Sequence, residues 1–233
     1  MKLKRKRVLL VILAIIIPSA VSAQTGKGPF TLIGVLRRLE GRDFEFDAGI
    51  ARHWQWHRDH HDPYVWYTWD IRFSGERIGG LVFASFNHSA GSLDSAVAPA
   101  EDWADWRVTG APVSEFTNLE TYRYLPELSH GTGDPGPAVL LEFTTVDVPP
   151  AAASAFEAKL KAGQPSLKGE TLWYRLVTGG SMTRYLCLRP QSRLSTVIEG
   201  SDDPLLAQAT ALASRVTMEL LISEPSLTID AGR

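Results

Sequence analysis

The sequence predicts an α+β protein in which two tandem ferredoxin-like halves close into one pseudo-symmetric α/β barrel. The Trp66-Tyr67 pair recurs about 107 positions later as Trp173-Tyr174. Each pair opens an aromatic strand that is followed by a Gly/Ser turn and a second apolar strand. Each half reads strand, helix, hairpin, helix, which is the order of a ferredoxin-like unit. Helices cover only one face of such a sheet, so a second copy is expected to cover the other.

The first half is predicted to span residues 24–129. Alternation and helical spacing of the apolar residues define its elements. The expected elements are strand Phe30–Arg37, helix Phe46–His60, strands Tyr64–Phe73 and Leu81–Phe86, a helix including Ala100–Trp106, and a closing strand Thr121–Leu125.

A linker over residues 130–137 is expected to join this half to the second half, residues 138–233. The linker contains Gly131, Gly133 and Gly136, but a strand instead of a helix follows, so a dinucleotide-binding loop is excluded. The second half is expected to contain strand Ala138–Thr145, a helix from Pro149 to about Lys161, strands Leu172–Val177 and Met182–Leu188, and a last helix from Asp203 with Leu205, Ala209, Leu212, Val216 and Leu220 on one face.

Residues 1–23 are predicted to be a signal peptide. Five basic residues precede the ten-residue apolar run Val8–Ile17, and Val21-Ser22-Ala23 matches a signal-peptidase site. The run is shorter than the ~20 residues that span a bilayer. We therefore expect general secretory export to the periplasm or the extracellular space, with cleavage after Ala23 and no membrane association afterwards. An uncleaved membrane anchor is the alternative.

Charge and cysteine content narrow the class of protein. Cleavage would leave 19 of the 24 basic residues against 26 acidic ones, a net charge of 19 − 26 = −7. This balance disfavours nucleic acid as a partner. Cys187 is the only cysteine, so no internal disulfide forms. We expect Cys187 to be a structural thiol in an alternating strand.

The element order, the aromatic strand before a glycine hairpin, and the segment Asp102–Trp106 (DWADW) resemble the dimeric α/β-barrel superfamily. Its relatives include antibiotic-biosynthesis-monooxygenase-like and NIPSNAP-like domains. The resemblance covers roughly residues 28–223. It implies that two copies in one chain form the barrel that other members make by dimerising. Members include cofactor-free oxygenases, haem-binding enzymes and proteins without known activity, so the fold does not assign a function.

Histidines form the strongest local anomaly. The histidines that lie within nine positions are His53, His57, His60 and His61. His53 and His57 are four residues apart, as are His57 and His61, so each pair would share a helix face. Such a face can hold a transition metal, with Asp62 or His88 as a further ligand, or supply an axial ligand to haem. The alternative is a polar helix end packed against neighbouring tryptophans.

A strand face provides the second candidate site. In the first half this face carries Trp66, Thr68, Asp70 and Arg72. The matched face of the second half carries Trp173 and Arg175, with Arg184 on the neighbouring strand. If this face lines the barrel, its interior would suit a small aromatic or anionic ligand. Alternatively, the face meets solvent and the apolar residues of the strand face the helices.

Three functions are compatible with these patterns. The first is an exported protein that binds a small molecule. The second is an enzyme of the oxygenase or haem-degrading type, and the third is a structural or partner-binding protein with a filled barrel. The sequence lacks Gly-x-Ser-x-Gly, Ser-x-x-Lys and P-loop motifs, which excludes the nucleophile and nucleotide sites that these motifs form.

Overall fold

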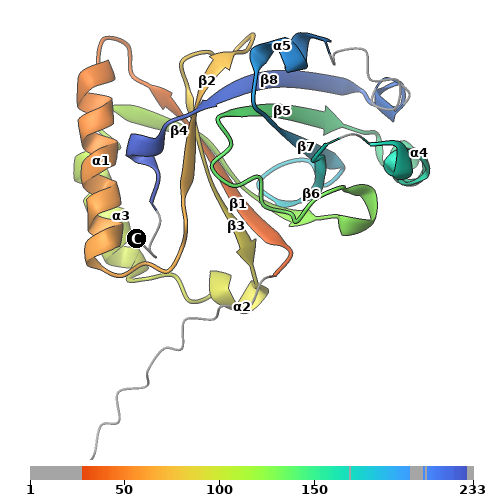
Figure 1. Ribbon diagram of the computed structural model, residues 1–233. Coiled ribbons are helices and arrows are strands. Elements are labelled where there is room, and N and C mark those ends of the chain that lie inside the picture. The colour runs from red at the N-terminus through yellow and green to blue at the C-terminus, as the bar shows by residue number, and fades with distance from the viewer. Residues whose placement is uncertain (1–27, 168, 200–206, 208, 230–233) are drawn as a thin grey trace, which may run out of the picture.

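The computed structural model describes residues 28–167, 169–199, 207 and 209–229 (Figure 1). The predicted signal peptide lies outside these residues. Within the described part of the chain, the helices lack the length and hydropathy of a transmembrane span.

Eight antiparallel strands form one closed barrel, in the order β1-β3-β2-β8-β5-β7-β6-β4. The strands are β1 (Phe30–Arg38), β2 (Tyr67–Phe73), β3 (Leu81–His88), β4 (Ser114–Tyr124), β5 (Leu140–Asp147), β6 (Leu172–Thr178), β7 (Arg184–Gln191) and β8 (Arg215–Ser223). The predicted α+β barrel is therefore confirmed.

The barrel closes across two seams between the amino-terminal and carboxy-terminal strands. β2 pairs with β8, through Ile71 and Leu221 for example, and β4 pairs with β6, through Tyr124 and Tyr174. Between the seams, the order β4-β1-β3-β2 matches the order β8-β5-β7-β6. Every strand thus has two neighbours, and the sheet has no free edge.

The last predicted helix is too long, because Ala209 and Thr210 are helical but the chain has left the helix before Arg215. Val216 and Leu220 lie in strand β8, not in the last turns of a helix that starts at Asp203. Residues 203–206 lie outside the described residues. The segment Arg215–Ser223 supplies the strand between β2 and β5, and pairing on both sides outweighs its weak helical periodicity.

Helices cover the barrel on two opposite sides (Figure 1). The helices are α1 (Asp43–Asp59), α2 (Ala90–Leu93), α3 (Pro99–Thr109), α4 (Ala153–Gly163) and α5 (Leu194–Glu199), with short 3₁₀ turns η1 (Pro126–Leu128), η2 (Pro150–Ala152), η3 (Gln164–Ser166) and η4 (Pro225–Leu227). α1, α3 and η4 form the layer on the side of β1 to β3, while α4 lies on the side of β5 to β7.

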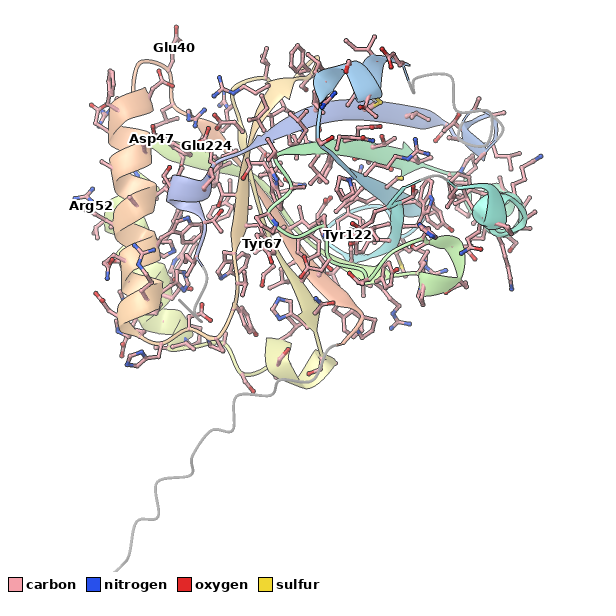
Figure 2. All side chains as sticks on the ribbon, viewed as in Figure 1. Glu40, Asp47, Arg52, Tyr67, Tyr122 and Glu224 are labelled. Carbon is pink, nitrogen blue, oxygen red and sulfur yellow. The ribbon has the colours of Figure 1, made fainter. Side chains whose placement is uncertain are left out.

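Apolar side chains from all eight strands fill the barrel interior. They are Ile33, Val35, Trp69, Ile71, Val82, Ala84, Phe86, Tyr122, Leu141, Phe143, Leu172, Tyr174, Leu176, Leu186, Leu188 and Leu221. Tyr67 packs against this cluster, and Figure 2 labels it together with Tyr122. The alternation of each strand thus directs one apolar set inward.

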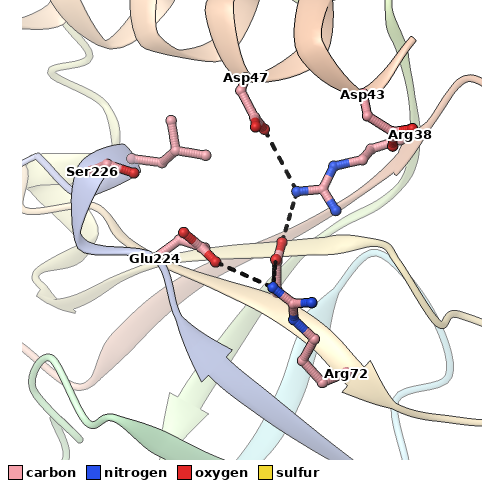
Figure 3. Close-up of a pocket in the computed structure, with 8 residues that line it drawn as sticks. Arg38, Asp43, Asp47, Arg72, Glu224 and Ser226 are labelled. Atoms are coloured by element: carbon pink, nitrogen blue, oxygen red, sulfur yellow. Dashed lines mark hydrogen bonds and ion pairs between the residues drawn. The ribbon is translucent and has the colours of Figure 1, made fainter. Parts of the chain in front are cut away.

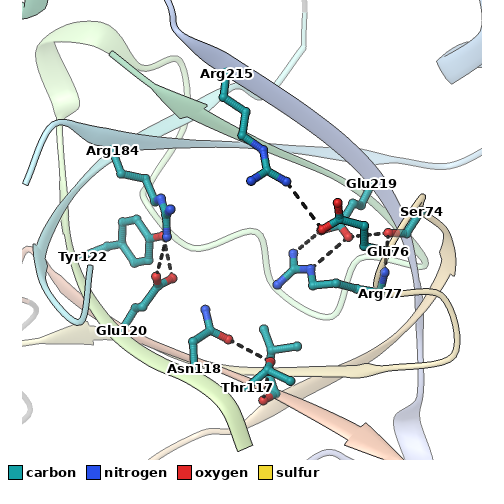
Figure 4. A network of polar contacts seen from close by, with 11 residues as sticks. Ser74, Glu76, Arg77, Thr117, Asn118, Glu120, Tyr122, Arg184, Arg215 and Glu219 are labelled. Atoms are coloured by element: carbon teal, nitrogen blue, oxygen red, sulfur yellow. Dashed lines mark hydrogen bonds and ion pairs between the residues drawn. The ribbon is translucent and has the colours of Figure 1, made fainter. Parts of the chain in front are cut away.

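A polar network closes one end of this interior (Figure 4). Glu219 is buried. Its carboxylate accepts one hydrogen bond from Arg77 Nε at 3.0 Å and another from the Ser74 hydroxyl at 2.6 Å. Glu120 is also buried and lies 2.8 Å from both Arg184 Nη1 and the Tyr122 hydroxyl. Burial, followed by the charge of Glu120, raises the pKa of Tyr122. Both buried carboxylates therefore have a guanidinium partner, as the cost of burying a charge requires.

Helices α1 and α3 approach each other closely. Phe46, Ile50 and Trp54 on α1 are buried against the sheet, as their helical spacing predicts. Gly49 faces α3, where a Cβ atom would lie 2.3 Å from the Thr109 carbonyl oxygen. The glycine therefore permits the contact that brings the histidines of α1 next to the acidic residues of α3.

Candidate functional site

The two faces of β2 differ from both sequence interpretations, which placed the Asp70 face either inside the barrel or in solvent. Trp69 and Ile71 belong to the barrel interior, whereas Trp66 packs against α1. Thr68, on the same face as Trp66, donates its hydroxyl hydrogen to the Leu227 carbonyl of η4 at 2.6 Å. The face that carries Asp70 and Arg72 thus points outward into the helical layer, so the predicted cavity inside the barrel is wrong.

The matched residues of the second half lie on the other side of the barrel. Trp173 packs against Phe156 of α4, with ring centroids 5.7 Å apart. Arg175 is half-exposed and pairs with Glu157 of α4 at 3.2 Å. The structure therefore does not bring Trp173 and Arg175 together with Trp66, Asp70 and Arg72.

Asp70 and Arg72 nevertheless line a pocket, which we call the Asp70 pocket (Figure 3). Its volume is about 310 Å³, and it lies between the amino-terminal turn of α1, β2 and η4. The lining residues are Arg38, Asp43, Asp47, Asp70, Arg72, Glu224, Ser226 and Leu227. Asp47 and Glu224 flank this side of the barrel (Figure 2).

Asp70 is the buried centre of the pocket. Its two carboxylate oxygens lie 2.8 Å from Arg38 Nη2 and 2.9 Å from Arg72 Nη2. Arg38 also lies 3.7 Å from Asp47, and Arg72 lies 3.7 Å from Glu224. Arg38 stacks on Phe46, with Cζ 4.8 Å from the ring centroid, so the base of α1 fixes its direction.

Carboxyl groups outnumber guanidiniums in the pocket. Four acidic side chains and two arginines line it, a formal sum of 2 − 4 = −2. Burial raises the pKa of Glu224, and the charge of Asp70 and a hydrogen bond with its carboxylate raise it further. The acidic excess disfavours the anionic ligand expected from the sequence, while a raised pKa makes the Glu224 carboxylate a stronger proton acceptor than an ordinary glutamate.

A second cluster lies at the other end of α1, where we find two of the three predicted metal-binding histidines. His53 Nε2 and His57 Nε2 lie 3.4 Å and 3.5 Å from Asp102 Oδ1 of α3. Their Nδ1 atoms lie 2.8 Å from Asp105 Oδ2 and 2.7 Å from Asp62 Oδ2. Both imidazoles are buried, and burial lowers the pKa of His53 and raises that of Asp102.

His61 does not belong to this cluster. α1 ends at Asp59, and His61 has a φ of 54°, so the chain has left the helix before it could align with His57. His61 is exposed. His88 is also elsewhere, with Nε2 2.8 Å from the Ser85 hydroxyl. Asp62 contacts His57 through Nδ1 and thus orients it, while Asp102, which the sequence did not single out as a ligand, faces both histidines.

The donor atoms of the cluster suit a small cation better than a haem. A haem ligand needs open space beyond its Nε2 atom, but Asp102 stands 3.4 Å and 3.5 Å from the two Nε2 atoms. The Asp70 pocket has no histidine in its lining, and the barrel interior is packed. The sequence predicted either a transition metal or a haem at these histidines. The described residues of the cluster fit the metal ion and not the haem.

No family model matches the sequence, and no curated protein has a significantly similar sequence. Solved structures do match the fold. A proposed monooxygenase from Fusobacterium nucleatum has a TM-score of 0.58 and 10% identity, and the match covers 84% of this chain and 92% of that one. The chain therefore shares its α+β barrel fold with this structure.

Two further matches carry other activities in their names. An anthrone oxidase-like protein has a TM-score of 0.55 and 12% identity, over 88% of this chain and 94% of that one. A chlorite dismutase from Candidatus Nitrospira defluvii has a TM-score of 0.54 and 11% identity, over 87% and 93%. At such identities the likeness establishes the fold alone.

Proposed function

We propose that this protein is an oxygenase-like enzyme that acts on a small, weakly acidic organic molecule in the Asp70 pocket. The carrying observation is the placement of Glu224, whose pKa is raised, beside the buried Asp70 and the guanidiniums of Arg38 and Arg72. The pocket joins a proton acceptor to two fixed positive charges, which is the arrangement that forms and stabilises an organic anion. The likeness to oxygenase-like barrels supports this reading over simple ligand binding.

Each side chain has a role in the proposed reaction. Glu224 takes a proton from a neutral C–H or O–H acid, and Arg38 and Arg72 stabilise the anion that forms. Asp70 holds both guanidiniums in position. The anion then passes electrons to O₂. For anthrone, one oxygen atom of O₂ becomes the new carbonyl oxygen at the methylene carbon, and the other leaves as water with the two methylene hydrogens. The acidic excess of the pocket favours entry of a neutral molecule, which becomes charged only on deprotonation.

Oxygen uptake with anthrone as the probe tests this function. Wild type should consume O₂ and form anthraquinone, and Glu224→Gln should lower the rate by about 10²- to 10⁴-fold, the usual contribution of a general base. Glu115→Gln is the matched control, because Glu115 is exposed and pairs with Arg37 away from the pocket. Equal rates for wild type and Glu224→Gln would contradict the proposal.

A binding protein without a reaction is the second candidate, because the Asp70 pocket could hold a ligand that is not transformed. A fluorescence or calorimetric titration that detects anthrone binding without O₂ uptake would favour it. The pocket lies in the helical layer, so neither candidate needs space inside the filled barrel.

We further propose that the signal peptide directs export and is cleaved after Ala23, and that the chain arose by tandem duplication of a ferredoxin-like unit. The matching strand orders on the two sides of the seams support duplication. So do Trp66 and Trp173, which pack outward under α1 and α4 respectively, while Tyr174 lies inside the barrel and Tyr67 packs against that interior cluster. Amino-terminal sequencing of the secreted protein should give Gln24 as the first residue.

A further inference from the structure

Two histidines and one aspartate converge between α1 and α3, away from the Asp70 pocket. Their ligand atoms all lie within 4.8 Å of one another. His53 and His57 share one face of α1, and Asp102 comes from the facing turn of α3. Asp102 Oδ1 is buried and has no hydrogen-bond partner among the described residues. A buried carboxylate oxygen without a partner is costly and requires a cation or a proton donor.

Hydrogen bonding fixes the tautomers of both imidazoles. The carboxylates of Asp105 and Asp62 can only accept, so the Nδ1 atom of each imidazole donates its hydrogen to them. The Nε2 atom of each neutral ring then carries a lone pair. Both lone pairs face the Asp102 oxygen, so one positive ion placed between them would satisfy all three acceptor atoms together.

Two of the three ligand separations match those around a metal ion, and all three ligand atoms lie within 4.8 Å of one another. Ligands about 2.0–2.1 Å from zinc in a tetrahedral arrangement are separated by about 3.4 Å. The two contacts from Asp102 Oδ1 to the imidazoles are 3.4 Å and 3.5 Å. Imidazoles whose second nitrogen donates to a carboxylate are also the usual form of metal-ligating histidine.

We propose that His53 Nε2, His57 Nε2 and the Asp102 carboxylate bind one divalent first-row transition metal, with Zn²⁺ as the simplest occupant. Asp105 and Asp62 are positioning residues that orient the two imidazoles. The Asp102 side chain is 36% exposed, so the site lies close enough to solvent for water to complete the coordination. Two imidazoles, one carboxylate and an open position form a set that binds zinc or iron.

Calorimetric titration of the folded mature chain with Zn²⁺ tests the site. Wild type should bind one equivalent, and His57→Ala and Asp102→Asn should each weaken binding by about 100-fold or more, because loss of an outer carboxylate alone costs about 10- to 100-fold. Asp105→Asn should keep the stoichiometry and weaken binding within that range. His61→Ala is the matched control and should bind as wild type, because His61 is an exposed histidine of the same segment.

Absence of Zn²⁺ binding to folded wild type would overturn the proposal, as would unchanged affinity in Asp102→Asn. An equal loss in His61→Ala would assign the binding to surface histidines instead. Asp102 is partly exposed, so its variant is expected to fold even where His57→Ala does not. Titration with Co²⁺ gives an independent readout, since visible absorption of a tetrahedral Co²⁺ complex should appear in wild type and vanish in Asp102→Asn.

Discussion

At the residue scale, the pocket depends on which partners surround Asp70. Strand alternation places Asp70 and Arg72 on one face and so predicts them as site residues. Periodicity does not select Arg38, the last residue of β1, or Glu224, which directly follows β8; strand pairing brings both near Asp70. Periodicity identifies residues on one element, but it carries no information about contacts between elements that are far apart in sequence.

The pH dependence of activity tests the role of Glu224. A general base must be unprotonated, so the rate should fall as the pH drops through the pKa of Glu224. Burial and Asp70 raise this pKa, so the acidic limb should lie above the ordinary Glu value of about 4.3. A profile of kcat/KM for anthrone oxidation measures the limb, and Glu224→Gln should remove it. A limb that persists unchanged in this variant would assign the base elsewhere.

The paired charges at the barrel end make a prediction about stability. Arg77→Met would leave the Glu219 carboxylate buried without its cation and should lower the free energy of unfolding by about 3–5 kcal/mol. Arg77→Met combined with Glu219→Met removes both charges and should recover much of this loss. Urea denaturation of both variants measures the difference. If the double variant is less stable than Arg77→Met, the loss of unfolding free energy does not come from the unpaired Glu219 charge. It would then come from loss of the polar contacts that Arg77 and Glu219 make together.

At the element scale, α1 supports both candidate sites. Its first turns carry Asp43 and Asp47 to the Asp70 pocket, and its last turns carry His53 and His57 to α3. The sequence predicted this helix and its buried face, because the apolar residues follow helical spacing. It did not predict that the chain turns away before His61, since a positive φ at a non-glycine residue leaves no clear signal in the pattern.

The contact between α1 and α3 can be tested through Gly49. Gly49→Ala places a Cβ atom 2.3 Å from the Thr109 carbonyl oxygen, so we expect a loss of about 1–3 kcal/mol from overpacking. This loss opposes the gain of about 1 kcal/mol that alanine brings to a helix. The variant should also bind Zn²⁺ more weakly, because the helices must separate.

Ala48→Gly is the control for Gly49→Ala, since Ala48 is exposed on the same helix. It should lower stability by about 1 kcal/mol through helix propensity alone and leave Zn²⁺ affinity unchanged. Thermal unfolding followed by circular dichroism measures both stabilities. A Gly49→Ala protein more stable than wild type would show that the interhelical contact is not tight.

At the scale of the whole molecule, the barrel is closed and its interior is filled with apolar side chains, so both candidate sites lie in the helical layer outside it. The sequence predicted the barrel from the repeated Trp-Tyr strand, yet it assigned a helix to the segment that contains β8. It also could not say which face of each strand points inward. An aromatic and apolar face can pack equally well on a helix or inside a barrel, and only closure of the sheet decides between them.

The matched strands carry different polar residues on the two sides of the barrel. On the α1 side, Asp70 is buried and holds two guanidiniums, while on the α4 side Arg175 forms one half-exposed ion pair with Glu157. We propose that catalysis takes place in the Asp70 pocket, on the α1 side. A pair of variants, one on each side, separates the two locations.

The most direct test is the rate of O₂ uptake with anthrone for wild type, Asp70→Asn and Arg175→Gln. Asp70→Asn should lower the rate by about 10²-fold or more, because the guanidiniums that stabilise the anion lose their anchor. Arg175→Gln should retain the wild-type rate. Retained activity in Asp70→Asn, or a comparable loss in Arg175→Gln, would contradict a site on the α1 side of the barrel.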